Sequence, residues 1–238
     1  MIKVLASGST GNCYIIQAGD DILLLECGIN IKDIKQGLDF DLSKVKGCLV
    51  THEHKDHCKS INNILAAGID VYMSQGTAKG MEFLDERYSY RFNYLRHKVP
   101  KNIAGFTIIP FNVQHDVNEP LGFLIYHPTI GKIVFATDTY SLLNITFKNV
   151  DHILIECNYF EGVLQTLPVS RAIRLIKSHM SLENLIETLK SWELGNTKDI
   201  TLIHISNDNG EPERFQQEIE TLTGIKTYVA EPGLIVGR

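Results

Sequence analysis

Residues 51–57 read Thr51-His52-Glu53-His54-Lys55-Asp56-His57, so three imidazoles and one aspartate fall within six consecutive positions. The whole chain has nine histidines, which makes this density a property of the segment. Groups of this kind are stable side by side only when a cation organises them. The apolar residues 47–50 before them predict the end of a buried strand, with the cluster on the loop that follows. On extended backbone His52 and His54 point to the same side and can share one ion, while Asp56 and His57 can reach a second ion.

The spacing of these residues excludes two common metal-binding patterns. A helical zinc-protease motif needs histidines at positions i and i+4 with a glutamate between them, but the residue four after His52 is Asp56. Paired CxxC zinc ligands are absent from the sequence. The remaining alternative to a metal site is a solvated loop that happens to be rich in histidine.

Two catalytic metal ions need more donors than one loop supplies, because each ion takes several protein ligands and keeps a position for water. Three further candidates each follow an apolar stretch that resembles a strand: His115 after residues 106–114, Asp138 after 132–137, and His204 after 200–203. Polar side chains at four strand ends can build one site on the rim of a sheet.

The motif THEHKDH, followed in order by His115, Asp138 and His204, resembles the metallo-β-lactamase fold superfamily of binuclear hydrolases. The resemblance implies that one divalent ion takes His52, His54 and His115, that a second takes Asp56, His57 and His204, and that Asp138 bridges them. Class B β-lactamases carry a cysteine where this chain has Asp138, so β-lactam hydrolysis is not expected. Zinc is the expected metal, and manganese or iron also suit these donors.

Three shorter segments narrow the resemblance to the YycJ (WalJ) branch, which is regarded as exonuclease-like and related to the tRNA 3′-processing and β-CASP nucleases. They are residues 7–12 (SGSTGN), 179–181 (HMS) and 204–209 (HISNDN). One position departs from the family pattern, because members usually carry Asp-Ala-Gly or Asp-Cys-Gly where this chain has Glu26-Cys27-Gly28. The usual aspartate orients a ligand histidine and tunes metal affinity. Glu26 is expected either to do the same with a longer side chain or to face water as an ordinary strand-end acid.

Composition predicts one hydrolase domain over residues 1–238 with no membrane segment. No apolar run approaches the ~20 residues of a membrane helix, and residues 1–6 read as a first strand rather than as a secretion signal. Five scattered cysteines in apolar surroundings suit free thiols in a reducing cytoplasm. The sequence has no Pro/Gly-rich linker and no sign of an obligate protein partner.

Apolar patterning alternates between strand-rich and helical blocks, in two halves. Strands are expected at residues 2–6, 13–18, 21–26, 47–50, 106–113, 121–127, 132–136, 151–156, 200–204 and 226–230. Helices are expected at residues 59–67, 76–85, 170–177, 181–193 and 211–222. This order predicts an α/β fold of the four-layer αββα sandwich type, with two sheets face to face and helices outside.

Phosphodiester hydrolysis also needs an acid outside the metal ligands, to protonate the leaving alkoxide. His179 is the best candidate, at the expected start of a helix, and Glu156 ends an apolar strand. In the tRNA 3′-processing relatives a glutamate at such a strand end pairs with a histidine of a later His-x-Ser/Thr element, and Glu156 and His179 resemble that dyad. The carboxylate would orient the imidazole and raise its pKa. We therefore expect Asp56, Glu156 and His179 as catalytic residues; the alternative for His179 is a helix-terminal histidine without catalytic duty.

Substrate-binding residues are expected at three places. The Ser/Gly turn contributes Ser7, Ser9, Thr10 and Asn12; such a turn can bind an anion through its amides, although it is also a common hairpin connection. Arg171 and Arg174 can grip phosphates or can lie on an exposed helix face. Residues 87–101 (RYSYRFNYLRHKVPK) interleave basic and aromatic side chains, which suits either a nucleic-acid surface or an alternating strand with its aromatic side chains in the core.

A formal charge of −5 argues against a protein coated in basic surface, so bound cations would supply positive charge where the substrate lies. The favoured function is a metal-dependent phosphodiesterase or exonuclease that acts on DNA, or on RNA, through a metal-activated water. The alternatives are a small-molecule hydrolase, such as a glyoxalase II-like thioesterase or a lactonase, and a binding module with an inactive site.

Overall fold

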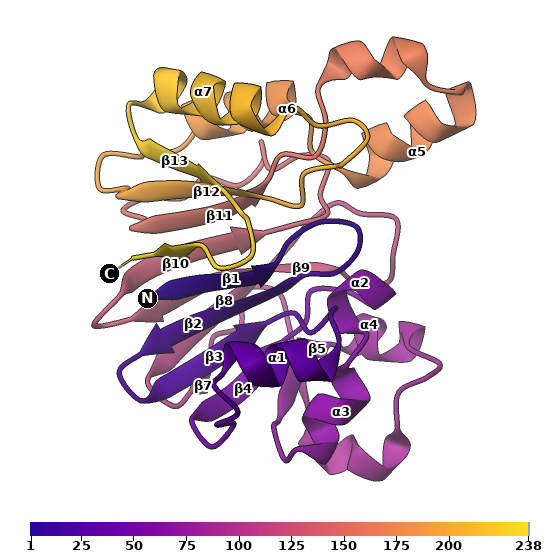
Figure 1. Cartoon of the computed structure of the whole chain (residues 1–238), viewed down its shortest axis with the longest axis vertical. Helices are drawn as coiled ribbons and strands as arrows, with labels where there is room; N and C mark the ends of the chain where they lie inside the picture. Colours follow the sequence, from indigo (N-terminus) through magenta and orange to yellow (C-terminus); the bar gives the residue numbers. More distant parts are fainter. Residues whose placement is uncertain (238) are drawn as a thin grey trace.

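Two mixed β-sheets of seven strands each pack face to face in the computed structural model, which describes residues 1–237 (Figure 1). The first sheet has the spatial order β14 (Ile235–Val236), β1 (Ile2–Ala6), β2 (Cys13–Ala18), β3 (Asp21–Leu25), β4 (Val45–Leu49), β5 (Val71–Ser74) and β6 (Phe92–Leu95). The second has the order β13 (Lys226–Val229), β12 (Asp199–Ile203), β11 (His152–Glu156), β10 (Gly131–Ala136), β9 (Leu121–His127), β8 (Phe106–Asn112) and β7 (Lys101–Ile103).

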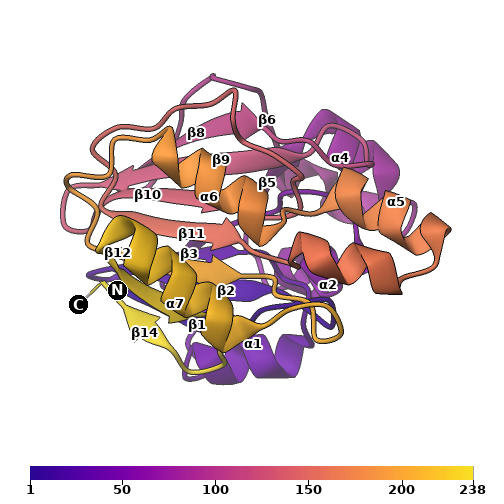
Figure 2. The same ribbon diagram turned by 90° about the horizontal axis from the view of Figure 1, so that it is seen from above.

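Helices cover the outer faces of both sheets (Figure 2). They are α1 (Ile31–Gly37), α2 (Lys55–Cys58), α3 (Ile61–Ala66), α4 (Gln75–Gly80), α5 (Val169–Ser178), α6 (Leu182–Lys190) and α7 (Pro212–Thr223), with 3₁₀ segments η1 (Glu86–Arg91) and η2 (Glu161–Thr166). α1 and α3 pack on the first sheet, and α6 and α7 pack on the second. α5 extends to the side of the molecule on which α2 also lies (Figure 2).

Three apolar layers hold these four layers of secondary structure together. The layer between the sheets contains Phe106, Phe123 and Phe135, all with at most 1% of their surface exposed. A second layer lies between the first sheet and its helices, and a third between the second sheet and its helices. The αββα sandwich expected from the sequence is confirmed.

Strand direction brings many strand ends to one rim of the molecule. β3, β4, β5 and β6 run parallel to one another in the first sheet, as do β10, β11, β12 and β13 in the second. β8 also points the same way as β10, because both are antiparallel to β9 between them. The loops that leave these carboxyl ends therefore meet at a common edge, where ligands bind in open α/β sheets.

The structure adds short elements that the apolar pattern did not predict, namely α1, β5, β7 and β14, while β6 falls in segment 87–101, for which a strand was one of two interpretations. α1 buries only Ile34, and the three strands are too short to show a clear alternation. The helix expected at 76–85 ends at Gly80, and the helix expected at 59–67 is confirmed as α3, with the additional short helix α2 just before it. Among residues 1–237 we find no helix with the length and apolar character needed to cross a bilayer.

Candidate metal centre and active site

The expected metal-binding residues meet at the rim that the parallel strands share. The loop after β4 carries His52 and His54, and the short helix α2 carries Asp56 and His57, where the sequence predicted a loop throughout. His115, Asp138 and His204 follow β8, β10 and β12. Asp56 Oδ2 and His204 Nε2 lie 3.5 Å apart although the residues are separated by 148 positions. The fold thus brings together side chains that the sequence scatters over most of the chain.

At three strand ends on this rim, a residue other than glycine has a left-handed backbone conformation. The φ angles are 63° at Glu26, 46° at Asp138 and 53° at His204. A non-glycine residue in this region carries strain of about 1–3 kcal/mol and persists only where its surroundings over-determine it. The concentration of such residues around one cluster indicates a functional site.

The first group of donors comprises three imidazole nitrogens and one carboxylate oxygen. His54 Nδ1 lies 3.1 Å from His52 Nε2 and 3.3 Å from His115 Nε2. Asp138 Oδ2 lies 3.7 Å from His52 Nε2 and 3.8 Å from His115 Nε2. Four donors placed tetrahedrally around one zinc ion would be about 3.4 Å apart, given metal–ligand bonds of about 2.1 Å. The residues present therefore fit one divalent cation.

The second group lies on the other side of Asp138. Asp56 Oδ2 is 3.4 Å from His57 Nε2 and 3.5 Å from His204 Nε2. Asp138 Oδ1 is 3.4 Å from His57 Nε2, while its other oxygen faces the first group. These donors form a second group that could hold a cation, and Asp138 contacts donors of both groups.

The charges in this cluster also match a cation site. Burial by itself would raise the pKa of Asp138, but the imidazoles of His204, His57 and His52 outweigh it and hold that pKa well below its usual range. Burial would lower the pKa of His204, but Asp138 and Asp56 raise it to about 10. Without metal the cluster therefore holds protons, and a metal ion that binds deprotonated ligands displaces them.

Two side chains behind the donors fix the orientation of the imidazoles. Thr51 Oγ1 lies 2.9 Å from His52 Nδ1, which leaves Nε2 toward the cluster. Glu26 is fully buried and its Oε1 lies 3.6 Å from His57 Nδ1, an atom with no hydrogen-bond partner among the described residues. Burial raises the pKa of Glu26 more than His57 and Thr51 lower it. Of the two expectations for Glu26, the structure excludes a strand-end acid that faces water.

Glu156 and His179 lie in contact beside the donor groups. His179 Nδ1 is 2.8 Å from Glu156 Oε1, and His204 Nδ1 is 3.1 Å from the same oxygen. Glu156 Oε2 accepts hydrogen bonds from the backbone amides of Thr139 (3.0 Å) and Met180 (3.1 Å). Burial lowers the pKa of His179, but Glu156 and Asp138 outweigh it, so the net shift is upward.

His179 does not lie at the start of a helix, as the sequence predicted. It follows the last residue of α5, whereas α6 begins after Ser181, whose Oγ accepts a hydrogen bond from the Asn184 amide at 3.1 Å. His179 therefore lies on the link between two helices. The cause is the extended backbone of residue 179, with ψ at 155°, which ends α5 before α6 can begin.

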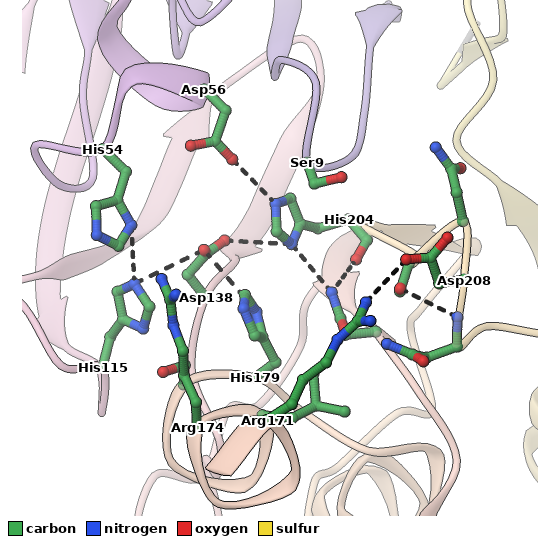
Figure 3. A pocket seen from close by; sticks show the side chains of 16 residues that line it. Ser9, His54, Asp56, His115, Asp138, Arg171, Arg174, His179, His204 and Asp208 are labelled. Atoms are coloured by element: carbon green, nitrogen blue, oxygen red, sulfur yellow. Dashed lines mark hydrogen bonds and ion pairs between the residues drawn. The ribbon is translucent and has the colours of Figure 1, made fainter. Parts of the chain in front are cut away.

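A cavity of about 440 Å³ opens over these residues (Figure 3). α5 forms one wall and contributes the guanidinium groups of Arg171 and Arg174. Arg171 Nη2 donates to Asp208 Oδ2 at 2.8 Å, which joins α5 to the loop after β12. Other residues of the wall are Ser9, His54, Asp56, His115, Asp138, Asn158, His179 and His204.

The residues of the Ser/Gly turn have different surroundings. Ser9 lines the cavity, whereas Thr10 is exposed to solvent and is not part of the cavity wall. Ser7 Oγ accepts a hydrogen bond from the His204 backbone amide at 2.9 Å. The buried Asn12 side chain donates to the Asp56 carbonyl at 3.2 Å. Ser7 and Asn12 therefore hold donor-bearing segments in place and do not face the cavity, because their polar atoms are already engaged.

Two further residues support the site, and no sequence motif pointed to them. Asn158 Nδ2 donates to the His204 carbonyl at 2.8 Å. Asp116 Oδ1 accepts a hydrogen bond from Ser178 Oγ at 2.8 Å, which ties the loop after His115 to α5. The available signals were weak: Asn158 lies two residues after Glu156, and Asp116 directly follows His115.

Comparison with known proteins agrees with this architecture. A family model described as "Beta-lactamase superfamily domain" matches residues 24–205. Exodeoxyribonuclease YycJ of Bacillus anthracis is 28% identical over 95% of this chain and 90% of its own length, and exodeoxyribonuclease WalJ of Streptococcus pneumoniae is 30% identical over 87% and 82%. The crystal structure of the metallo-β-lactamase fold protein YhfI from Bacillus subtilis has a TM-score of 0.74 at 17% identity, covering 98% of this chain and 97% of that one. The chain therefore belongs to the β-lactamase superfamily, in the YycJ and WalJ branch, and is a metal-dependent hydrolase.

Proposed function

We propose that this chain is a binuclear metal-dependent phosphodiesterase that shortens nucleic acids from a chain end, with DNA as its first substrate. The observation that carries the proposal is the Glu156–His179 pair, which adjoins the metal donors in a cavity that also holds Arg171 and Arg174. Metal donors alone suit many hydrolases. A proton donor together with two guanidinium groups suits a phosphodiester, whose leaving alkoxide needs a proton and whose oxygens bind arginine.

The two donor groups would each hold one divalent cation. One would be bound by His52, His54 and His115, the other by Asp56, His57 and His204. Asp138 would be shared, because it groups with the first three and its Oδ1 lies 3.4 Å from His57 Nε2. When bound, the two cations lower the pKa of a water between them and offset the negative charge of the phosphodiester. Zinc is the first choice for such donors, and manganese or iron also suit them.

His179 supplies the proton that the leaving group needs. Its Nδ1 is engaged by Glu156, so Nε2 is the nitrogen free to face a substrate. Glu156 and Asp138 outweigh burial and raise the pKa of the ring, which favours the protonated form that a general acid requires. Glu156 is itself held by two backbone amides and therefore orients the imidazole.

Two observations support nucleic acid, and a chain end, as the substrate. The relatives YycJ and WalJ are named exodeoxyribonucleases. Arg171 and Arg174 line the cavity beside His179, where their guanidinium groups can bind the phosphates of a strand. RNA is the second substrate of the proposal.

A single set of assays tests the function. Metal-loaded protein is offered end-labelled single- and double-stranded DNA, RNA of the same sequence, S-lactoylglutathione and an acyl-homoserine lactone. We expect mononucleotides to be released from DNA, with loss of activity in chelator and recovery with zinc or manganese. Turnover of the thioester or the lactone alone would show that the proposal is wrong and that the chain is a small-molecule hydrolase.

A further inference from the structure

The basic and aromatic segment 87–101 divides into two parts in the structure. In the first part the charges are already paired: Arg87 contacts Asp85 at 2.7 Å and Arg91 contacts Asp70 at 2.9 Å. Phe92 packs against the apolar layer under the helices. Tyr90 is 72% exposed, but its ring lies 5.2 Å from the guanidinium carbon of Arg91, so the cations of this part are all engaged within the fold.

The second part, residues 94–99, is exposed and is not explained by folding. Leu95 is buried between the sheets, but Tyr94 is 52% exposed and Val99 is 54% exposed. Arg96 and Lys98 are exposed and, within residues 1–237, have no acidic partner. The alternating-strand interpretation therefore accounts for Leu95 but not for Tyr94 or the free cations.

Most of these residues line a hollow with a fixed wall, and Lys98 lies outside its lining. The lining of a cavity of about 460 Å³ includes Tyr94, Leu95, Arg96, His97, Val99 and Glu119, and we call it the Tyr94 pocket. The Lys98 amide donates to the Pro110 carbonyl at 2.7 Å, and the Asn112 amide donates to His97 Nδ1 at 3.0 Å. Since Nδ1 of His97 accepts, its Nε2 is free to donate outward. Glu119 is the acid on the wall, and its Oε2 accepts from the Gly76 amide at 2.6 Å.

The Tyr94 pocket lies on the rim that carries the metal donors. β6 runs parallel to β5 and β4, so the turn after Leu95 emerges on the same side as the loop after β4. The loop from His115 to Glu119 connects the two cavities, because His115 lines the active-site cavity and Glu119 lines the Tyr94 pocket. Four chain steps span at most about 15 Å, a distance that a few nucleotides of an extended strand can bridge.

We propose that the Tyr94 pocket is a second binding site for the substrate strand, in which one base stacks on Tyr94 and one phosphate contacts Arg96, while the next phosphate contacts the exposed Lys98 beside the pocket. This inference rests on the proposed function and adds that the nucleic acid is single-stranded on this side of the active site. A base in a duplex has both faces covered, whereas an unpaired base can stack on an aromatic ring. DNA and RNA share this chemistry. The local positive charge is significant because the chain as a whole carries −5.

Binding without turnover tests the site directly. Fluorescein-labelled oligothymidine and oligouridine are titrated in EDTA, with anisotropy as the readout, at several salt concentrations. The test variant is R96Q/K98Q, and the matched control is R87Q/K148Q, which removes the same charge from exposed residues that already have acidic partners. We expect R96Q/K98Q to lower the slope of log affinity against log salt by about 1.4, because each phosphate contact on a single strand contributes about 0.7. Equal affinities and slopes in both variants would overturn the proposal.

Two single variants probe the ring and the opposing acid. We expect Tyr94→Ala to weaken binding by roughly fivefold or more, the loss of one stacked base. Glu119→Gln keeps an oxygen for the Gly76 amide and removes a negative charge, so it should tighten binding. Tyr94→Ala with unchanged affinity would remove the stacking role and overturn the proposal, as would an unchanged affinity in Glu119→Gln. Oligodeoxyuridine, as a third probe, differs from oligouridine only in lacking the 2′-hydroxyl, so tighter binding of oligodeoxyuridine would identify DNA as the source of the strand.

Turnover separates this inference from the proposed function. R96Q/K98Q should raise KM for an oligonucleotide that spans both cavities and leave kcat/KM for a dinucleotide unchanged. If wild-type protein cleaves the long oligonucleotide and every variant has the same KM, the second site is wrong and the proposed function stands. If wild-type protein binds oligonucleotides through Arg96 and Lys98 but cleaves none, the proposed function is wrong and the site stands.

Discussion

Nδ1 of His179 lies 2.8 Å from Oε1 of Glu156, where the link between α5 and α6 approaches the end of β11. The same carboxylate oxygen is 3.1 Å from Nδ1 of His204. Glu156 therefore touches both the proposed proton donor and one of the proposed metal ligands. Changes at His179 and at Glu156 should consequently have different effects on metal content.

His179→Ala should lower kcat by about 10²- to 10⁴-fold, the usual contribution of general acid catalysis. Two bound metal ions per chain should remain, because the substitution removes no proposed ligand. Glu156→Gln should lower both activity and metal affinity, since it also changes the contact with His204. Elemental analysis measures the metal content of both variants, and steady-state kinetics measures their kcat. Full activity in His179→Ala would remove this residue from the mechanism.

Activity should fall on the alkaline side of the pH profile as His179 loses its proton. Burial lowers the pKa of His179, but Glu156 and Asp138 raise it by more than burial lowers it. The net shift is upward, so the ring loses its proton at a higher pH than an ordinary histidine. The acid is present below the raised pKa and is lost as the pH rises through it. The profile of kcat/KM should show this descending limb in wild-type protein. The same limb in His179→Ala would assign it to another group.

Metal ions should stabilise the fold by mass action. A ligand at one hundred times its dissociation constant stabilises by about 2.7 kcal/mol, so zinc or manganese should raise Tm and a chelator should reverse the rise. Asp138→Asn should lose most of this effect, because Asp138 lies within 3.8 Å of donors in both groups. Scanning fluorimetry with elemental analysis checks both points. One ion per wild-type chain under metal-replete conditions would contradict the binuclear site.

Glu26→Gln should weaken metal binding by about 10- to 100-fold, the usual effect of removing a carboxylate that orients a ligand histidine. Glu26 Oε1 is the acidic atom behind His57 Nδ1, at 3.6 Å. Competition with a chelator of known affinity measures the change. Affinity equal to wild type would mean that Glu26 serves only the Thr51 amide, which lies 3.3 Å from its Oε1.

Gly28→Ala should destabilise the protein by about 1–3 kcal/mol or more, as overpacking of a tight contact does. A Cβ at position 28 would lie 1.7 Å from the Asp56 carbonyl oxygen and would push the donor-bearing loop away. Gly195→Ala is the matched control, because a Cβ there meets nothing within 4 Å. Denaturant unfolding with metal titration measures both variants. Equal stability of the two would refute the close approach.

Local patterns in the sequence identified the features that depend on near neighbours along the chain. The 51–57 segment places four donors within six consecutive positions, and the apolar runs before His115, Asp138 and His204 are enough to place these residues at strand ends. The family resemblance singled out Glu156 and His179. Periodicity was enough for the αββα order, because long strands and the helix with Leu182, Leu185 and Leu189 carry clear alternation or helical spacing.

Only the tertiary structure decided which side chains are exposed and which partner each side chain contacts. Ser7 and Asn12 belong to the same turn as Ser9, yet Ser7 binds the His204 amide across 197 positions and Asn12 binds the Asp56 carbonyl across 44. Arg87 and Arg96 look alike in the sequence, but only Arg87 has an acidic partner among the described residues. Sequence by itself determined the donor types, their spacing and the strands that carry them. The exposure and partner of each side chain depend on how two sheets pack, and contacts between distant segments leave no periodic signal in the chain.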